Sequence, residues 1–273
     1  MTTEPAAPSA GEVAELRVAL IRNRCVNDGT PDSGGEHRSA ATIEAYLGAA
    51  GRRFEPHPGR VSTLVRVPGT DPSAPALLLL GHTDVVPVTR SGWSVDPFEG
   101  IRKDGFVWGR GAVDMLIQTA SMAAVFLRYL RGEVPAPPGD LVFLAVADEE
   151  AGGKLGAAYL TEHHWDEVAA PFVLTEIGAP MLPGAGGPGL PVTVAEKGPH
   201  WRTFRVRGVP GHDSQPYGTR NALVPLAEAV TRLASEPAPI VISDEWRAFV
   251  AAWEPDPQLA ADLIDPDHVD DAV

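Results

Sequence analysis

The chain has 273 residues, of which 44% are hydrophobic and 21% charged, so it can bury a sizeable core and is neither a disordered nor a fibrous protein. Its formal net charge of -14 repels phosphate backbones and anionic lipid surfaces, so we expect neither nucleic-acid nor membrane partners. The single cysteine, Cys25, excludes an internal disulfide, and the first residues lack a signal-peptide pattern, which together predict a cytoplasmic protein.

Helical and strand-like apolar patterns alternate through the first two thirds of the chain. The runs at 76–80 and 141–147 are continuously apolar, which indicates strands buried on both faces. Alternation of this kind is typical of α/β layering around a mainly parallel central sheet. In chain order, we predict helices at 12–24 and 36–50, strands at 61–67 and 76–80, a β-hairpin at 98–108, a helix at 116–132, a strand at 141–147, a helix at 154–163 and a strand at 172–175.

A Gly/Pro-rich stretch at 178–191 interrupts this alternation and indicates a domain boundary. Beyond it, 201–207 alternates as an amphipathic strand and 221–233 carries apolar residues at helical spacing. We therefore predict a first, α/β domain over 1–190 and the start of an α+β domain over 191–273.

Potential metal ligands follow three of the predicted strands and begin one helix. The ligand crevice of an open α/β sheet lies outside the carboxyl ends of its strands, so we expect these side chains to converge. Several acids in one crevice repel each other unless a cation neutralises them, which favours a divalent metal site. The candidates are His82, Asp84, Asp114, Glu149, Glu150 and Glu176.

Each candidate also has an ordinary structural explanation when it is taken alone. His82 could be a packed histidine, Asp114 a partner for its helix dipole, and the Glu149-Glu150 pair a solvated loop. Imidazole and carboxylates without a thiolate suit zinc, with cobalt or manganese as alternatives. Asp84 is placed to accept a hydrogen bond from the second imidazole nitrogen of His82. One of the two glutamates can bind the metal while the other holds a proton near the attacking water.

Several motifs resemble the acetylornithine deacetylase, succinyl-diaminopimelate desuccinylase and carboxypeptidase G family of di-zinc hydrolases. They are Gly81-His82-Thr83-Asp84, residues 92–98, residues 109–115 and Asp148-Glu149-Glu150, followed by residues 195–198 and 211–216, which are similar to the lid or dimerisation domain of that family. The resemblance implies a zinc-peptidase-like catalytic domain over 1–190, a partial lid over 191–273, and a homodimer formed through the lid.

The resemblance also implies a role for each site residue. Asp114 would bridge two metal ions and be joined to Met115 by a cis peptide bond. His82 and Glu176 would complete one metal site and Glu150 would serve the other. Glu149 would be the general base, and His212 of the lid would help to polarise the scissile carbonyl.

The sequence departs from the family pattern in ways that bear on activity. The family usually has a lysine and two glycines after Met115, where this chain has residues 116–118, Leu-Ile-Gln. A final metal-binding histidine after the lid is missing, and His268, in an acidic tail with no strand before it, is not expected to replace it. We therefore interpret the chain as the N-terminal part of a longer protein, and we expect it to bind one or two metal ions.

The leading interpretation is a zinc-dependent hydrolase that cleaves an amide or peptide bond in an N-acyl amino acid or a short peptide. A truncated paralogue, catalytically weak or inactive, that keeps the fold and a partial metal site is the first alternative. A related aminopeptidase, whose substrate carries a free amine, is the second.

Overall fold

The computed structural model describes residues 7–176, 181–184, 186–191, 202–212, 214–215, 217–237 and 239–273. The chain divides into two units, residues 1–177 and residues 178–273, and each is described by itself. The domain boundary placed at residue 190 from the sequence stays a prediction.

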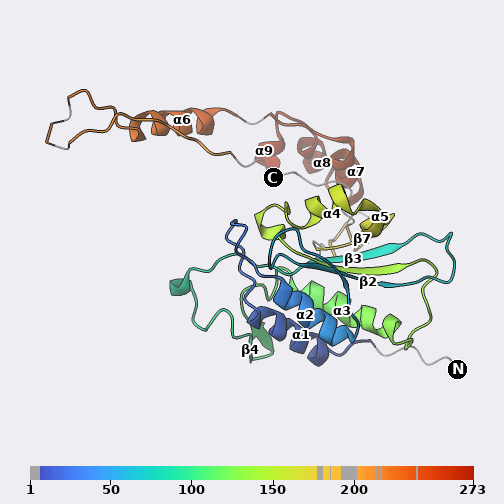
Figure 1. The fold of residues 1–273 in the computed structure, drawn as a ribbon. Helices are drawn as coiled ribbons and strands as arrows, with labels where there is room; N and C mark the ends of the chain where they lie inside the picture. Colours follow the sequence, from blue (N-terminus) through green and yellow to red (C-terminus); the bar gives the residue numbers. More distant parts are fainter. Residues whose placement is uncertain are drawn as a thin grey trace. The chain divides into compact units, whose positions relative to one another are not determined.

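A five-stranded sheet with the order β1-β2-β6-β3-β7 forms the centre of the first unit (Figure 1). β3 pairs in parallel with both β6 and β7, whereas β2 pairs antiparallel with β6 and with β1. The strands are β1 (Arg52–Phe54), β2 (Ser62–Val67), β3 (Leu77–His82), β6 (Leu141–Val146) and β7 (Phe172–Leu174).

The α/β class is confirmed, but the sheet is mixed where the sequence pattern predicts a mainly parallel one. The physical reason is the short link between β2 and β3, which contains no helix. A parallel connection needs a crossover of about a dozen residues or more, so β2 and β3 run in opposite directions. The parallel half of the sheet, β6-β3-β7, is the half that carries the candidate site.

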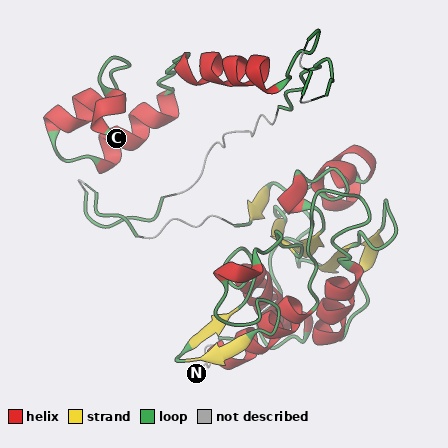
Figure 2. Ribbon diagram, turned by 90° about the vertical axis from the view of Figure 1, so that its left-hand side faces the viewer, coloured by secondary structure: helices red, strands yellow, loops and turns green. Residues whose placement is uncertain are grey.

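Helices cover both faces of this sheet (Figures 1 and 2). One core cluster joins α1, α2 and α3 to side chains such as Phe143 on one face of the sheet. A second cluster joins α4 and α5 to side chains such as Val142 and Leu144 on the opposite face. β6 is thus buried on both faces, as its continuous apolar run predicts. The helices are α1 (Ala10–Arg22), α2 (His37–Leu47), α3 (Leu116–Leu130), α4 (Ala157–His163) and α5 (Trp165–Val168).

Close packing of α3 on β3 brings the start of the helix to the end of the strand. The face of α3 predicted to be apolar is buried, with Ala120 and Ala123 at 0% exposure. A Cβ added at Gly81 would lie 2.5 Å from Thr119 Oγ1, so only glycine fits this contact without a shift. Thr119 Oγ1 donates a hydrogen bond to the carbonyl of His82 at 2.9 Å, which ties the strand end to the helix.

Two local predictions have different outcomes. The hairpin is confirmed as β4 (Ile101–Lys103) and β5 (Phe106–Trp108), which turns at Asp104 and Gly105 with φ of 54° and 81°. The sequence places the second helix at 36–50 with Gly51 as its cap, but α2 ends earlier, at Leu47, and its left-handed cap is Gly48, with a φ of 64°.

The second unit contains α6 (Leu223–Ser235), α7 (Asp244–Trp253), α8 (Pro257–Leu263) and α9 (Val269–Ala272). α6 confirms the predicted helix at 221–233. The strand predicted at 201–207 is wrong for residues 202–207, which form no regular element; residue 201 lies outside the described part of the chain. An alternating segment needs a neighbouring strand, and the antiparallel bridges between described residues of this region, Val209 to Arg220 and His212 to Gln215, lie beyond residue 207.

No helix in the part of the chain that the structure describes is both long and apolar enough to cross a membrane.

Candidate metal centre

His82 is the last residue of β3, and its side chain is only 1% exposed. Its Nδ1 lies 3.0 Å from the main-chain carbonyl oxygen of Asp84 and 3.6 Å from the Asp84 carboxylate. Because a carbonyl oxygen can only accept, Nδ1 carries a hydrogen and donates it. The ring is therefore oriented by the backbone of Asp84, and Nε2 is the nitrogen left to bind a proton or a metal.

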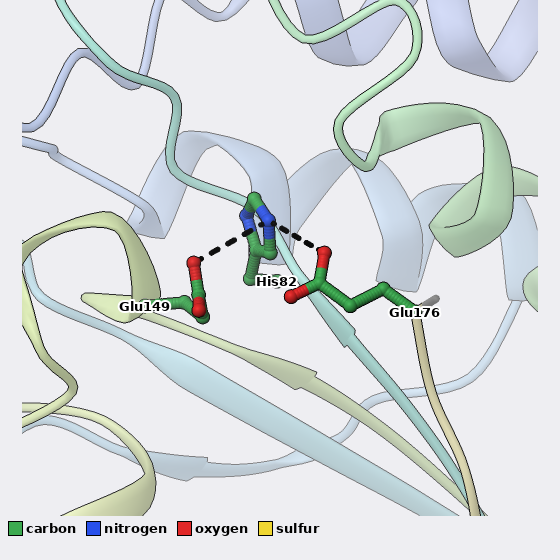
Figure 3. A group of neighbouring side chains, drawn as sticks. All are labelled: His82, Glu149 and Glu176. Atoms are coloured by element: carbon green, nitrogen blue, oxygen red, sulfur yellow. Dashed lines mark ion pairs between the residues drawn. The ribbon is translucent and has the colours of Figure 1, made fainter. Parts of the chain in front are cut away.

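Three carboxylates from separate elements surround Nε2 of His82. Asp114 Oδ1 lies at 3.1 Å, Glu176 Oε2 at 3.6 Å and Glu149 Oε2 at 3.7 Å. Figure 3 shows His82 between Glu149 and Glu176, with both carboxylates directed at the ring. A lone pair on Nε2 would repel these oxygens, so the arrangement calls for a proton or a metal cation in their midst.

Two groups of three side chains have ligand atoms within 4.8 Å of one another: His82, Glu149 and Glu176 in one, and His82, Asp114 and Glu150 in the other. The four proposed ligands, His82, Asp114, Glu150 and Glu176, therefore all belong to these two overlapping groups. Glu149, expected to act as a base, also lies at ligand distance, so the division of roles between Glu149 and Glu150 stays a prediction. Both groups use the same histidine.

Burial, together with the charges of neighbouring acids, disfavours the ionised carboxylates at this site. Burial raises the pKa of Glu150 to about 7; His82 opposes this shift, and the charges of Asp114, Asp84 and Glu149 add to it. Burial likewise raises the pKa of Glu149 and of Glu176. Burial alone would lower the pKa of His82, but the surrounding carboxylates outweigh it and raise that pKa. Such a donor set fits a divalent cation, which would neutralise the acids.

Two backbone segments present the acids: the residues before α3 carry Asp114, and a turn after β6 carries Glu149 and Glu150. The peptide bond between Asp114 and Met115 is cis, as the resemblance implies, and α3 begins at the next residue. Glu149 and Glu150 lie in a single 3₁₀ turn, η2 (Glu149–Ala151). The Asp84 carboxylate accepts hydrogen bonds from the main-chain N–H groups of Glu149, at 3.2 Å, and Glu150, at 3.1 Å. Asp84 thus positions the glutamate turn with its side chain.

A cavity of ≈ 280 Å³ lies beside the site. His82, Glu149 and Glu176 form part of its wall, together with Gly152 and Gly153. The cavity places open space next to the converging carboxylates.

Four further polar residues next to the site have no assigned role from the sequence. Asn27, Glu36, Arg60 and Asp148 are each at most 5% exposed and are joined by hydrogen bonds that end on Asp84. Asp148 stands in a recognised motif, but the motif gives no role to its side chain. The other three give no periodic signal, although Arg60, a charged residue two positions before the buried strand β2, was an available clue.

His212 belongs to the second unit, where it is exposed. Its Nδ1 lies 2.7 Å from Ser214 Oγ. The motif at 195–198, and Asp213 and Pro216 of the second motif, lie outside the described residues. His268 is exposed and lies 2.9 Å from an Asp265 carboxylate oxygen. The role proposed for His212 stays a prediction.

Comparison with known proteins identifies the family. The model of peptidase family M20/M25/M40 matches residues 78–261, which is more than half of the chain. The chain belongs to this family. The M20 match includes the ends of β3, β6 and β7 and every candidate ligand, from His82 to Glu176.

Curated relatives of this M20 chain include two hydrolases. Aminoacylase-1 of Sus scrofa is 35% identical over 190 residues, which cover 68% of this chain and 44% of the relative. Succinyl-diaminopimelate desuccinylase of Cereibacter sphaeroides is 35% identical over 156 residues, covering 57% of this chain and 40% of the relative. The chain thus spans less than half the length of these relatives.

A solved structure supports the fold. An M20 family metallo-carboxypeptidase from Sulfolobus solfataricus superimposes with a TM-score of 0.58 at 18% sequence identity, covering 88% of this chain and 56% of that protein. The α/β architecture is therefore that of an M20 enzyme.

Proposed function

We propose that this M20 chain is a zinc-dependent hydrolase that cleaves the amide or peptide bond of an N-acyl amino acid or a short peptide. The observation that carries the proposal is the convergence of Asp114, Glu149 and Glu176 on a single imidazole nitrogen, Nε2 of His82. Membership of the M20 family and the similarity to aminoacylase-1 support the choice of amide substrates.

His82, Asp114, Glu150 and Glu176 are the proposed metal ligands. A bound zinc ion would supply Lewis acidity toward the scissile carbonyl and would make an attacking water more acidic. Glu149 is the proposed general base: it takes a proton from that water and returns it to the leaving amine. A general base must lie close to the proton that it moves, and Glu149 Oε2 lies 3.7 Å from Nε2 of His82, beside the proposed metal ligands.

Asp84 holds the reacting groups in place, through its carbonyl on the His82 ring and its carboxylate on the glutamate turn. His212 is proposed to polarise the scissile carbonyl. The cavity of ≈ 280 Å³ next to Glu149 and Glu176 is suited to a small acyl group or a short side chain.

A non-catalytic, metal-binding protein is the second candidate, and one observation favours it. Both candidate ligand groups in the described part of the chain depend on His82. A catalytic zinc usually has three protein ligands and a water, so two ions at this site would have to share one histidine. We therefore expect one tightly held ion per chain, and the alternative predicts that this ion supports no turnover.

The deciding experiment is hydrolysis by the metal-stripped chain after zinc, cobalt or manganese is added. N-acetyl amino acids and dipeptides are compared with aminoacyl amides, with Glu149→Gln as the test variant and Glu162→Gln, an exposed glutamate on α4, as its control. Metal-dependent release of free amino acid from the first two substrates, lost in Glu149→Gln alone, supports the proposal. Cleavage of aminoacyl amides and dipeptides without cleavage of N-acetyl amino acids identifies an aminopeptidase. Metal binding without any cleavage identifies the non-catalytic alternative.

The proposed homodimer through residues 191–273 is tested separately by light scattering of the same preparation. A mass of twice 28.8 kDa is expected. A monomer at all concentrations would contradict it.

A further inference from the structure

A buried ionic network lies next to the candidate metal centre. Arg60 is 1% exposed, and its partners Glu36 and Asp148 are 0% and 5% exposed. Ionised groups lose most of their hydration when they are buried, so such a cluster persists only where its hydrogen bonds are nearly complete.

Every nitrogen of the Arg60 guanidinium has a partner. Nε and Nη2 donate to the Glu36 carboxylate at 2.8 Å each, and Nη2 also donates to Asp148 Oδ1 at 2.8 Å. Nη1 donates to the carbonyl of Thr30 at 3.3 Å. Arg60 therefore joins the segment before α2, the start of β2 and the end of β6. A lysine, with one nitrogen, cannot make this set of contacts.

Asp148 connects Arg60 to the glutamate turn, η2. Its φ of 68° lies in the left-handed region, which is uncommon for residues other than glycine but is adopted by aspartate more often than by most. Its carboxylate accepts from Arg60, from Asn27 Nδ2 at 3.0 Å and from the N–H of Leu155 at 2.8 Å. The next two residues in the chain are Glu149 and Glu150.

Asn27 links Asp148 to Asp84. Its side-chain Nδ2 donates one hydrogen to Asp148 Oδ1 and the other to Asp84 Oδ2 at 2.8 Å. The same Asp84 carboxylate binds the N–H groups of Glu149 and Glu150. The glutamate turn is thus held at its start through Asp148 and at its main-chain N–H groups through Asp84.

Arg60 also offsets part of the negative charge of this network. The network contains three carboxylates, those of Glu36, Asp84 and Asp148, and Arg60 contacts two of them. Without the guanidinium, Glu36 and Asp148 would face each other as buried like charges.

We infer that Arg60 is a positioning residue for the metal centre: its guanidinium fixes Asp148 and thereby aims Glu149 and Glu150 at His82. The inference rests on the proposed function, because it assigns Arg60 a role toward the metal site proposed there.

The test compares Arg60→Lys, which keeps the charge but cannot bridge both acids, with Arg66→Lys. Arg66 is an arginine of β2 that pairs with Asp140 at 2.8 Å near the surface, so its replacement by lysine is the matched control. Zinc affinity is measured by competition with a chromophoric chelator. If the wild type is active, kcat and KM of the wild type and of each variant are measured at saturating zinc. The temperature is kept below the unfolding temperature of every variant.

We expect Arg60→Lys to bind zinc about 10- to 100-fold more weakly than the wild type, the range found for residues that hold metal ligands in place. The kcat at saturating zinc should fall while KM changes little, and Arg66→Lys should match the wild type. A purely stabilising role would lower the unfolding temperature but leave the zinc affinity and kcat of the folded protein unchanged.

Asn27→Ala is the second variant, because it cuts the link between Asp148 and Asp84 while leaving the Arg60 ion pairs in place. It should weaken zinc binding in the same way, and it decides the question if Arg60→Lys does not fold. Wild-type affinity in folded Arg60→Lys, or in Asn27→Ala, would overturn the inference. A wild-type chain that binds no zinc would instead overturn the proposed function and the inference together.

Discussion

Removing the charge of Glu150 should stabilise the metal-free protein at alkaline pH. Burial and the neighbouring acids raise the pKa of Glu150 from 4.5 to about 7 in the folded chain. As the pH rises above 4.5, the unfolded chain releases this proton first, so ionisation favours unfolding. The penalty is absent below the unfolded pKa and is complete once the pH exceeds the folded pKa.

The size of this penalty follows from the shift. One pKa unit corresponds to about 1.4 kcal/mol, so the shift of Glu150 amounts to about 3 kcal/mol before solvent screening. The side chain is only partly buried, and screening reduces the penalty to about 1–2 kcal/mol. For a unit of this size, that corresponds to about 5 °C in the unfolding temperature.

The assay is thermal unfolding of the metal-free chain between pH 5 and pH 8, with Glu150→Gln beside the wild type. The two proteins should unfold at similar temperatures at pH 5, and Glu150→Gln should be the more stable by about 5 °C at pH 8. Zinc added at pH 8 should stabilise the wild type more than the variant. Parallel pH profiles for the two proteins would refute the argument that burial and the neighbouring acids disfavour the ionised form of Glu150 when no cation is bound.

Three further substitutions test separate parts of the site and its support. Asp84→Asn should weaken zinc binding about 10-fold, as measured by chelator competition, because its amide group cannot accept all the bonds that the carboxylate accepts; unchanged affinity would remove Asp84 from the positioning network. Glu149→Gln should keep its zinc by metal analysis while losing hydrolysis by about 100-fold or more, and loss of zinc would make Glu149 a ligand. Gly81→Ala should lower the free energy of unfolding in urea by about 1–3 kcal/mol, since the new Cβ would lie 2.5 Å from Thr119 Oγ1; an unaffected midpoint would show that α3 moves away freely.

The sequence predicts most of the first unit because its elements have strong local patterns. The short, continuous apolar runs of β3 and β6 indicate buried strands, and the helical spacing of apolar residues indicates the buried stripe of α3. The convergence of His82 with Glu149 and Glu176 follows from one rule, that parallel strands deliver their carboxyl ends to the same edge of a sheet.

The parts that escaped prediction depend on contacts between distant residues. Arg60 meets Glu36 across 24 residues and Asp148 across 88, and neither separation leaves a trace in local sequence. The three-residue strand β1 is too short to show a pattern, and the direction of β2 depends on the short link that follows it. Alternation at 202–207 suggested a strand, but alternation describes one face of a sheet and does not supply the neighbouring strand.

Zinc binding by His82→Ala tests the central claim most directly, because both candidate ligand groups share this histidine. The metal-stripped wild type and the variant are titrated with zinc against a chromophoric chelator. His164→Ala, which alters a partly buried histidine next to Glu167, serves as the control. We predict that the wild type and the control bind zinc tightly and that His82→Ala loses more than about 100-fold in affinity, beyond the range for residues that only hold a ligand. Equal zinc affinity in His82→Ala and the wild type, or no tight binding by the wild type, would contradict a metal centre built on His82.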